Sequence, residues 1–236
     1  MIVGRGEEDL YHSLVARSTR PWGPGTSAIV RALVAASTPV SQVELASLIG
    51  VSQPRVSQVL ARLSKARAVD PTEEGYCGRP DQLIDLYLAD HRPALAEADV
   101  AWYSLQPMRE QVERACAHAR STSTRVAVSA DLAPDLLAAW RHPTLTVIYT
   151  AEALDLTAAG FVQAEGRVDA TVLVRHTTDS LLLAACEPWP RVVDNIPVVD
   201  PVQQMWDLHD LGGEDRAEAA DRLRQALLGR ALASRA

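Results

Sequence analysis

The sequence has no apolar run approaching the ~18 residues that a membrane-spanning helix needs, and its first residues, Met1 to Arg5, do not resemble a signal peptide. We therefore expect a cytoplasmic protein without a membrane partner. Cysteine is also scarce: Cys77, Cys116 and Cys186 are far apart, and none has a histidine at metal-ligand spacing. Reduced, partly buried thiols are expected, with neither a metal site nor a cofactor.

Lysine is nearly absent, because 22 of the 23 basic residues are arginine and Lys65 is the only lysine. A restriction-nuclease core needs an acidic-x-Lys pair on a strand, but Lys65 lies within a helix predicted over residues 52–67. Residues 128–131 lack the glycine and the paired aspartates of a nucleotidyltransferase, and neither a Walker A loop nor a G-x-S-x-G sequence occurs. We expect no enzymatic activity; a catalytic site of an unrecognised kind is the alternative.

The chain contains 236 residues, of which 47% are hydrophobic and 22% charged, and its net charge is −7. This length suits two small domains with buried cores. The charge is unevenly divided: residues 1–67 have eight basic and four acidic side chains, a net charge of +4, and the remainder has a net charge of −11. A basic first part and an acidic second part are typical of a DNA-binding module joined to a domain that does not contact DNA.

We predict an α+β protein in three parts. Residues 1–26 form an N-terminal arm, residues 27–93 a winged helix-turn-helix, and residues 94–236 a mixed α+β domain for association or partner binding. In the second part, Ser27 is expected to cap a first helix, residues 69–79 to form a β-wing, and Asp81 to cap a further helix.

The spacing of four residues predicts the helix-turn-helix. Ala46 lets a second helix cross the first at close range, and Gly50 permits the sharp turn between them. Val56 and Val59 then fill the core between the two helices. Ser41 begins a capping box with Glu44, and Ser52 is placed to cap a second helix that extends to about residue 67.

The second helix has a polar outer face that suits duplex DNA. Glutamine and serine can hydrogen-bond to base edges in the major groove, whereas arginine and lysine can contact phosphates. An ordinary helical hairpin with a solvated polar face is the alternative, as is an exposed Arg79 without a role in binding. The candidate DNA-binding residues are Ser41, Ser52, Gln53, Arg55, Ser57, Gln58, Arg62, Lys65 and Arg79.

In the third part we expect helices over residues 106–120, 131–141, 201–211 and 214–232, and strands over residues 125–129, 145–149, 170–175 and 181–185. Gly212 and Gly213 break the last two helices apart. Asp207, His209 and Asp210 have metal-ligating side chains, but a solvated helix surface is the expected interpretation.

The chain resembles MarR-like regulators and AbiEi-like antitoxins of type IV toxin–antitoxin systems. The resemblance lies in the helix-turn-helix, in residues 125–133 and 140–144, and in residues 200–208 followed by Gly212, Gly213 and residues 216–220. It implies a DNA-binding repressor. Because one winged helix reads only a few base pairs, we also expect a homodimer or tandem binding on DNA. The alternative that it implies is an antitoxin-like protein that restrains a cognate nucleotidyltransferase toxin and regulates its own operon.

Overall fold

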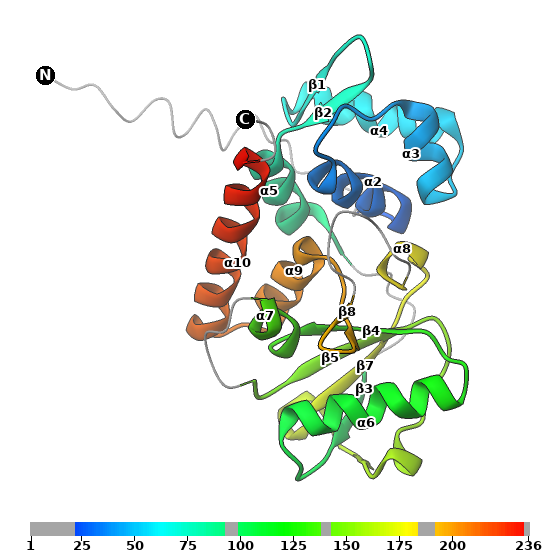
Figure 1. Cartoon of the computed structure of the whole chain (residues 1–236), viewed down its shortest axis with the longest axis vertical. Helices are drawn as coiled ribbons and strands as arrows, with labels where there is room; N and C mark the ends of the chain where they lie inside the picture. Colours follow the sequence, from blue (N-terminus) through cyan, green and yellow to red (C-terminus); the bar gives the residue numbers. More distant parts are fainter. Residues whose placement is uncertain (1–21, 93–98, 138–142, 184–191, 234–236) are drawn as a thin grey trace, which may run out of the picture.

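The computed structural model describes residues 22–92, 99–137, 143–183 and 192–233 of a mixed α+β chain (Figure 1). The helices are α2 (Pro24–Ala35), α3 (Gln42–Ile49), α4 (Gln53–Lys65), α5 (Pro80–Asp90), α6 (Met108–Ser121), α7 (Leu132–Leu137), α8 (Ser180–Leu183), α9 (Pro201–Leu211) and α10 (Glu214–Ala233), with 3-10 turns η1 (Thr157–Ala159) and η2 (Arg167–Asp169). The strands are β1 (Val69–Pro71), β2 (Tyr76–Gly78), β3 (Val100–Tyr103), β4 (Val126–Ala130), β5 (Thr146–Thr150), β6 (Val162–Gln163), β7 (Val172–His176), β8 (Val192–Val193) and β9 (Ile196–Pro197). None of the described helices has both the length and the apolar character that crossing a membrane requires.

The first described part is a group of helices followed by an antiparallel hairpin, and it forms one end of the molecule (Figure 1). Strands β1 and β2 pair from Val69–Gly78 to Pro71–Tyr76. Val40, between α2 and α3, adds a bridge to Tyr76, with a backbone hydrogen bond in each direction at 3.0 and 2.9 Å. The hairpin is therefore tied to the segment that enters α3.

The other end of the molecule is built on a five-stranded mixed sheet with the order β4-β5-β7-β3-β6. Only the β5–β7 pair is parallel. Adjacent residues of β5 face opposite sides: Ile148 packs in the apolar cluster that contains Ala115 and Ala119 of α6, whereas Tyr149 points to α9. The sheet is thus covered by α6 on one face and by α9 on the other.

The largest apolar core includes residues from both ends of the chain. Leu33 of α2, Leu60 of α4 and Tyr87 of α5 belong to the same buried cluster as Met205 of α9 and Leu223 of α10. On the surface beside this core, Arg224 of α10 forms ion pairs with two aspartates of α5. The hydrophobic core therefore includes residues from both sides of the domain boundary predicted between residues 93 and 94.

Several predicted elements are confirmed, and some begin or fold differently. Helices α3 and α9 have the predicted ends, and strands β4, β5 and β7 lie within one or two residues of their predicted positions. Ser27 does not cap α2, because the helix begins at Pro24 and the buried Ser27 hydroxyl bonds to His91 Nδ1 at 2.8 Å. Residues 181–183, predicted as part of a strand, lie in helix α8.

Other differences concern short elements and helix starts. Helix α5 begins at Pro80 rather than after an Asp81 cap, and α4 ends at Lys65, two residues before the predicted end. Strands β3 and β6 and the β8–β9 hairpin were not predicted. Of the arm predicted over residues 1–26, Trp22 is buried in the apolar core and residues 24–26 belong to α2, so this end is not a loose arm. Residues 1–21 and part of the helix predicted for 131–141 lie outside the described residues.

Candidate nucleic-acid interface and a buried polar network

The turn between α3 and α4 has the local geometry that its sequence predicts. Ser41 Oγ accepts a hydrogen bond from the Glu44 amide at 3.2 Å, and Glu44 Oε2 accepts one from the Ser41 amide at 2.8 Å, so the capping box is confirmed. Gly50 ends α3 in the left-handed region, with φ of 73°. A side chain would strain this backbone, which explains the glycine.

Helix α4 has one buried face and one exposed face. Val56, Val59, Leu60 and Leu63 are buried in the apolar core beneath it. The opposite face is exposed and mostly polar or cationic, with Pro54 and Ala61 as its apolar members. It contains seven of the nine candidate DNA-binding residues, all exposed: Ser52, Gln53, Arg55, Ser57, Gln58, Arg62 and Lys65.

Two residues at the start of α4 differ from expectation in their contacts. Ser52 occupies the N-cap position, but its side chain makes no capping hydrogen bond. Arg55 Nη2 donates to Thr26 Oγ1 of α2 at 2.9 Å, so this arginine fastens α4 to α2. Arg62 and Lys65 are exposed cations in the last turn of α4.

The hairpin beside α4 packs so closely that two of its positions require glycine. A Cβ on Gly75 would lie 2.5 Å from the Val40 carbonyl oxygen, and one on Gly78 would lie 2.6 Å from the Leu33 carbonyl oxygen. Gly75 also has φ of 151°. These contacts fix the hairpin against the first helix and the segment before α3.

Arg79, the last candidate residue, forms a bidentate ion pair at the base of the hairpin. Its Nε and Nη2 atoms donate to the two Asp70 carboxylate oxygens at 2.7 and 2.8 Å. The hydrogen bond from Arg79 lowers the pKa of Asp70 below its usual value. Arg79 and Ser41 therefore both have defined partners within the chain, and Ser41 is only half-buried at the N-terminus of α3.

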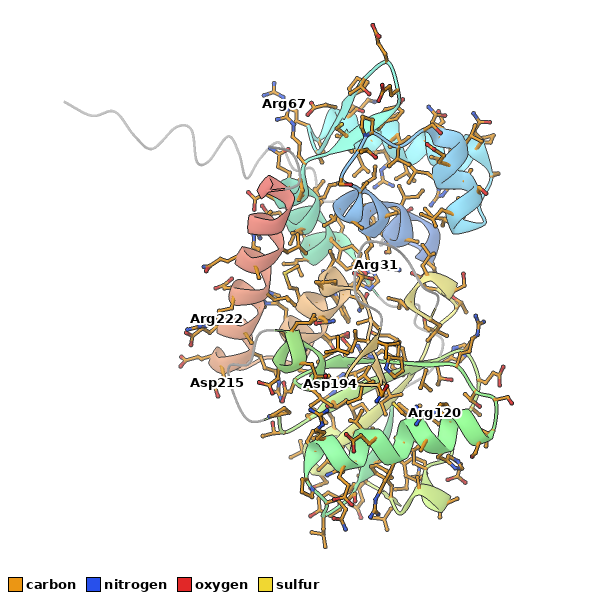
Figure 2. The ribbon with its side chains drawn as sticks, viewed as in Figure 1. Arg31, Arg67, Arg120, Asp194, Asp215 and Arg222 are labelled. Carbon is orange, nitrogen blue, oxygen red and sulfur yellow. The ribbon has the colours of Figure 1, made fainter. Side chains whose placement is uncertain are left out.

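Arg31, which the charge count included in the basic part, faces inward from α2 (Figure 2). Its side chain is 4% exposed and lies 2.8 Å from carboxylate oxygens of both Asp179 and Asp200. It also donates to the Tyr87 hydroxyl at 3.1 Å. Its charge is balanced by residues of the acidic part and does not contribute to a DNA-facing surface.

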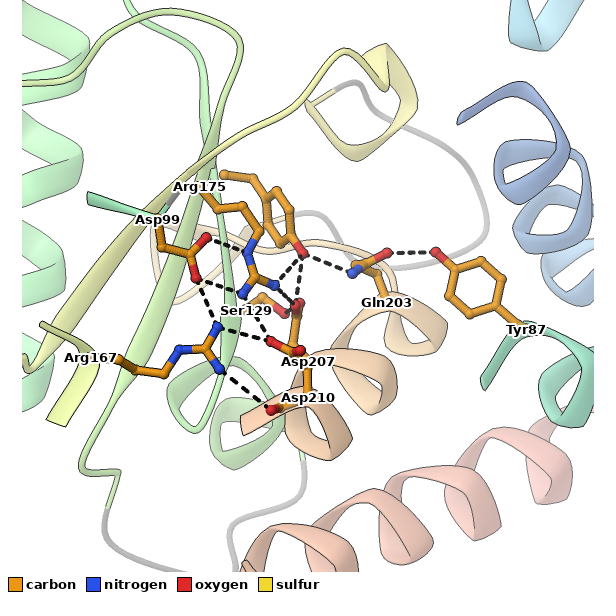
Figure 3. A network of polar contacts seen from close by, with 9 residues as sticks. Tyr87, Asp99, Ser129, Arg167, Arg175, Gln203, Asp207 and Asp210 are labelled. Carbon is orange, nitrogen blue, oxygen red and sulfur yellow. Dashed lines mark hydrogen bonds and ion pairs between the residues drawn. The ribbon is translucent and has the colours of Figure 1, made fainter. Parts of the chain in front are cut away.

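A second polar cluster lies between α9 and the sheet (Figure 3). Asp207 of α9 is completely buried and accepts three hydrogen bonds, from Ser129 Oγ at 2.5 Å, Tyr149 OH at 2.7 Å and Arg175 Nη1 at 2.7 Å. The donors come from β4, β5 and β7 respectively. One carboxylate thus joins α9 to three strands.

The cluster continues to the helical end of the molecule. Gln203, one turn before Asp207, donates to Tyr149 OH at 2.8 Å and accepts from Tyr87 OH at 2.5 Å (Figure 3). Tyr87 belongs to α5 and accepts in turn from Arg31 of α2. An unbroken series of hydrogen bonds therefore runs from α2 to the sheet, entirely through buried side chains.

The outer end of the cluster is an alternating ring of charges. Arg175 donates to both oxygens of Asp99 at 2.8 Å and to Asp210 at 3.0 Å, and Arg167 contacts the same two carboxylates at 3.0 and 3.2 Å. Asp99 begins the described segment that leads into β3. The ring anchors β3, β7 and the end of α9 to one another.

The interpretation of Asp207 as part of a solvated helix surface is wrong. Burial raises the pKa of Asp207 to about 6, although Arg175 and the hydroxyl donors oppose that rise. His209 of the same sequence is exposed, and Asp210 is partly exposed in the ring of charges. The four-residue spacing of Gln203 and Asp207, which places both on one helix face, was the available signal.

In the described part of the chain, no group of three His, Cys, Asp or Glu side chains is placed to hold a metal ion. Comparison with known proteins adds no family: no protein-family model, curated protein or solved structure matches this chain.

Proposed function

We propose that this chain is a sequence-specific DNA-binding transcriptional regulator, and that α2, α3, α4 and the β1–β2 hairpin form a winged helix-turn-helix with α4 in the major groove. The exposed polar face of α4 is the observation that carries the proposal. It combines glutamine and serine, which suit base edges, with arginine and lysine, which suit phosphates. Helices α3 and α4 lie at the end of the molecule opposite the sheet (Figure 1), and among the described residues this face is exposed.

Within this face we assign different roles to two sets of residues. Gln53 and Gln58 contact bases, since a glutamine amide can pair with adenine through two hydrogen bonds. Arg62 and Lys65 contact phosphates. A homodimer, tandem binding and an association with a toxin protein stay predictions, as does the relationship to AbiEi-like and MarR-like regulators.

A salt titration of binding tests the phosphate assignment. Arg62→Ala with Lys65→Ala should weaken binding to every duplex and lower the slope of log K against log salt by about 0.9 for each lost contact. Arg109→Ala with Arg114→Ala removes two exposed cations from α6, at the other end of the molecule, and is the control. An unchanged slope in the α4 variant, or an equal change in the control, would contradict the assignment.

Competition between duplexes tests the base contacts. Gln53→Ala with Gln58→Ala should leave affinity for a random duplex within about twofold, and lower affinity for a sequence selected by the wild-type chain by about 10-fold or more. Equal losses for both duplexes would show that α4 does not distinguish sequences. Failure of the wild-type chain to bind any duplex at low salt would refute the proposed function itself.

A further inference from the structure

The tip of the β1–β2 hairpin holds two adjacent carboxylates away from the body of the protein. Glu73 and Glu74 lie between Thr72 and Gly75, which close the turn through a hydrogen bond from Thr72 N to Gly75 O at 2.7 Å and one from Gly75 N to Thr72 Oγ1 at 3.1 Å. Both glutamates are exposed, and no arginine or lysine of residues 22–92 forms an ion pair with either. The turn therefore presents a charge of −2 to solvent.

The rest of the hairpin does not offset this charge. The only cation on it is Arg79, which forms its bidentate pair with Asp70 at the opposite end from the tip. The hairpin and α4 share the end of the molecule that is opposite the sheet (Figure 1). Exposed charges interact over a Debye length of about 8–10 Å, so the hairpin tip repels a duplex in any orientation that brings phosphates within that distance of it.

We propose that Glu73 and Glu74 determine DNA selectivity by keeping the hairpin out of the grooves and confining contact to α4. This inference rests on the proposed DNA binding. A complex held only by phosphates is loose and samples many orientations, including those with the hairpin against the duplex. A complex with α4 seated on its preferred sequence has one orientation. The carboxylates therefore weaken the loose complexes more than the seated one.

The test uses the full chain with Glu73→Gln and Glu74→Gln, substitutions that keep size and remove charge. The control is Glu165→Gln with Asp169→Asn, which removes two exposed charges near η2 at the sheet end. Two duplexes of equal length and composition serve as probes: one selected from a random pool by the wild-type chain, and one scrambled. Unfolding midpoints of all variants establish that the fold is retained.

The hairpin variant should bind the scrambled duplex roughly 3- to 10-fold more tightly at low salt, and the selected duplex with a smaller gain, so that the ratio of the two affinities falls. The control should change neither affinity. Equal gains for both duplexes, or the same gains in the control, would overturn the inference, because net charge alone would then explain them.

A third result would also overturn it. If the hairpin variant loses affinity only for sites with cytosine at one position, the glutamates accept hydrogen bonds from cytosine amino groups and the hairpin enters the groove. These outcomes are distinct from failure of the proposed function, in which the wild-type chain binds neither duplex. That failure would overturn both proposals before any variant is compared.

Discussion

Replacing Arg31 by methionine should lower the free energy of unfolding by about 3 kcal/mol without changing the salt dependence of DNA binding. The guanidinium is 4% exposed and makes close contacts with Asp179, Asp200 and the Tyr87 hydroxyl. Methionine keeps much of the aliphatic length but removes the charge, so two carboxylates that are only 9% and 13% exposed lose their cation. Removing one partner of a buried ion pair typically costs about 3–5 kcal/mol.

The lower end of that range applies because both carboxylates keep other donors. Asp179 Oδ1 still accepts from the Leu181 amide at 3.0 Å, and Asp200 Oδ1 from the amides of Val202 and Gln203 at 3.1 Å. Each aspartate thus keeps part of the hydrogen bonding that stabilises its charge. A loss of about 3 kcal/mol corresponds to a change of about a hundredfold in the unfolding equilibrium, since ~1.4 kcal/mol is tenfold.

Arg109→Met is the matched control, because Arg109 also contacts two carboxylates. Its side chain is 49% exposed, and its contacts with Glu113 and Asp194 are both 3.1 Å. Exposed ion pairs of this kind are screened by solvent and contribute little to stability. The two variants therefore remove the same charge and the same number of ion pairs, and differ in burial.

Urea denaturation, followed by tryptophan fluorescence, gives the free energy of unfolding of each variant. The comparison is valid when the free energy of unfolding falls with urea concentration at the same slope in the wild type and in both variants. The salt titration of duplex binding is then repeated with Arg31→Met under conditions where it is folded. A loss of stability below about 1 kcal/mol, or one equal to that of Arg109→Met, would refute the burial argument. A smaller salt slope would show instead that Arg31 contacts phosphate.

Two further variants test the buried cluster and the hairpin. Asp207→Asn should flatten the dependence of stability on pH. The pKa of Asp207 is raised to about 6 in the folded protein, above its unfolded value of about 3.9, so the protonated carboxyl favours folding at low pH. Up to ~3 kcal/mol of this stability is lost in the wild-type protein as pH rises through 6, and the variant should not show the loss. Parallel wild-type and variant curves in urea denaturation between about pH 4 and 7 would contradict this. Gly78→Ala should cost about 1–3 kcal/mol, because its Cβ would lie 2.6 Å from the Leu33 carbonyl oxygen. Gly166→Ala, whose Cβ would have nothing within 4 Å, should change stability by less than about 0.5 kcal/mol; equal thermal unfolding midpoints of the two variants would count against this prediction.

The features that sequence alone predicted are those whose causes lie within a few residues. The Ser41–Glu44 capping box depends on residues three positions apart, and the left-handed Gly50 depends on its own backbone. The apolar spacing of Val56 and Val59 follows from the period of one helix. Such local signals gave the bounds of α3 and the exposed face of α4 without knowledge of any distant residue.

Short apolar segments were less predictable because helix and strand patterns coincide over four or five residues. Residues 181–185 are an unbroken apolar run, which suits a buried strand as well as a buried helix. The deciding signal precedes the run: the Asp179 carboxylate accepts from the Leu181 amide at 3.0 Å, as a residue at a helix N-terminus does. Strand β6, with only two residues, left no periodic pattern to recognise.

The hydrogen-bond partners of Asp207 could not be predicted for a different reason, since they are distant from it in sequence. Asp207 meets Ser129, Tyr149 and Arg175 only after three strands and α9 have been brought together. A carboxylate on an amphipathic helix is ordinarily exposed, so the sequence favoured a solvent-exposed position for Asp207. Only the donors supplied by the folded sheet make burial of this charge tolerable.

Contacts between residues distant in sequence also change the interpretation of the uneven charge along the chain. Arg31 belongs by position to the basic part of the chain, but its charge is neutralised by two aspartates of the acidic part. Over residues 41–79 the exposed cations other than the paired Arg79 are Arg55, Arg62, Lys65 and Arg67. If each contacts one phosphate, the salt slope for this region is at most about 3.6. A steeper measured slope would therefore require cations from elsewhere, either in another part of the chain or on a second copy bound beside the first.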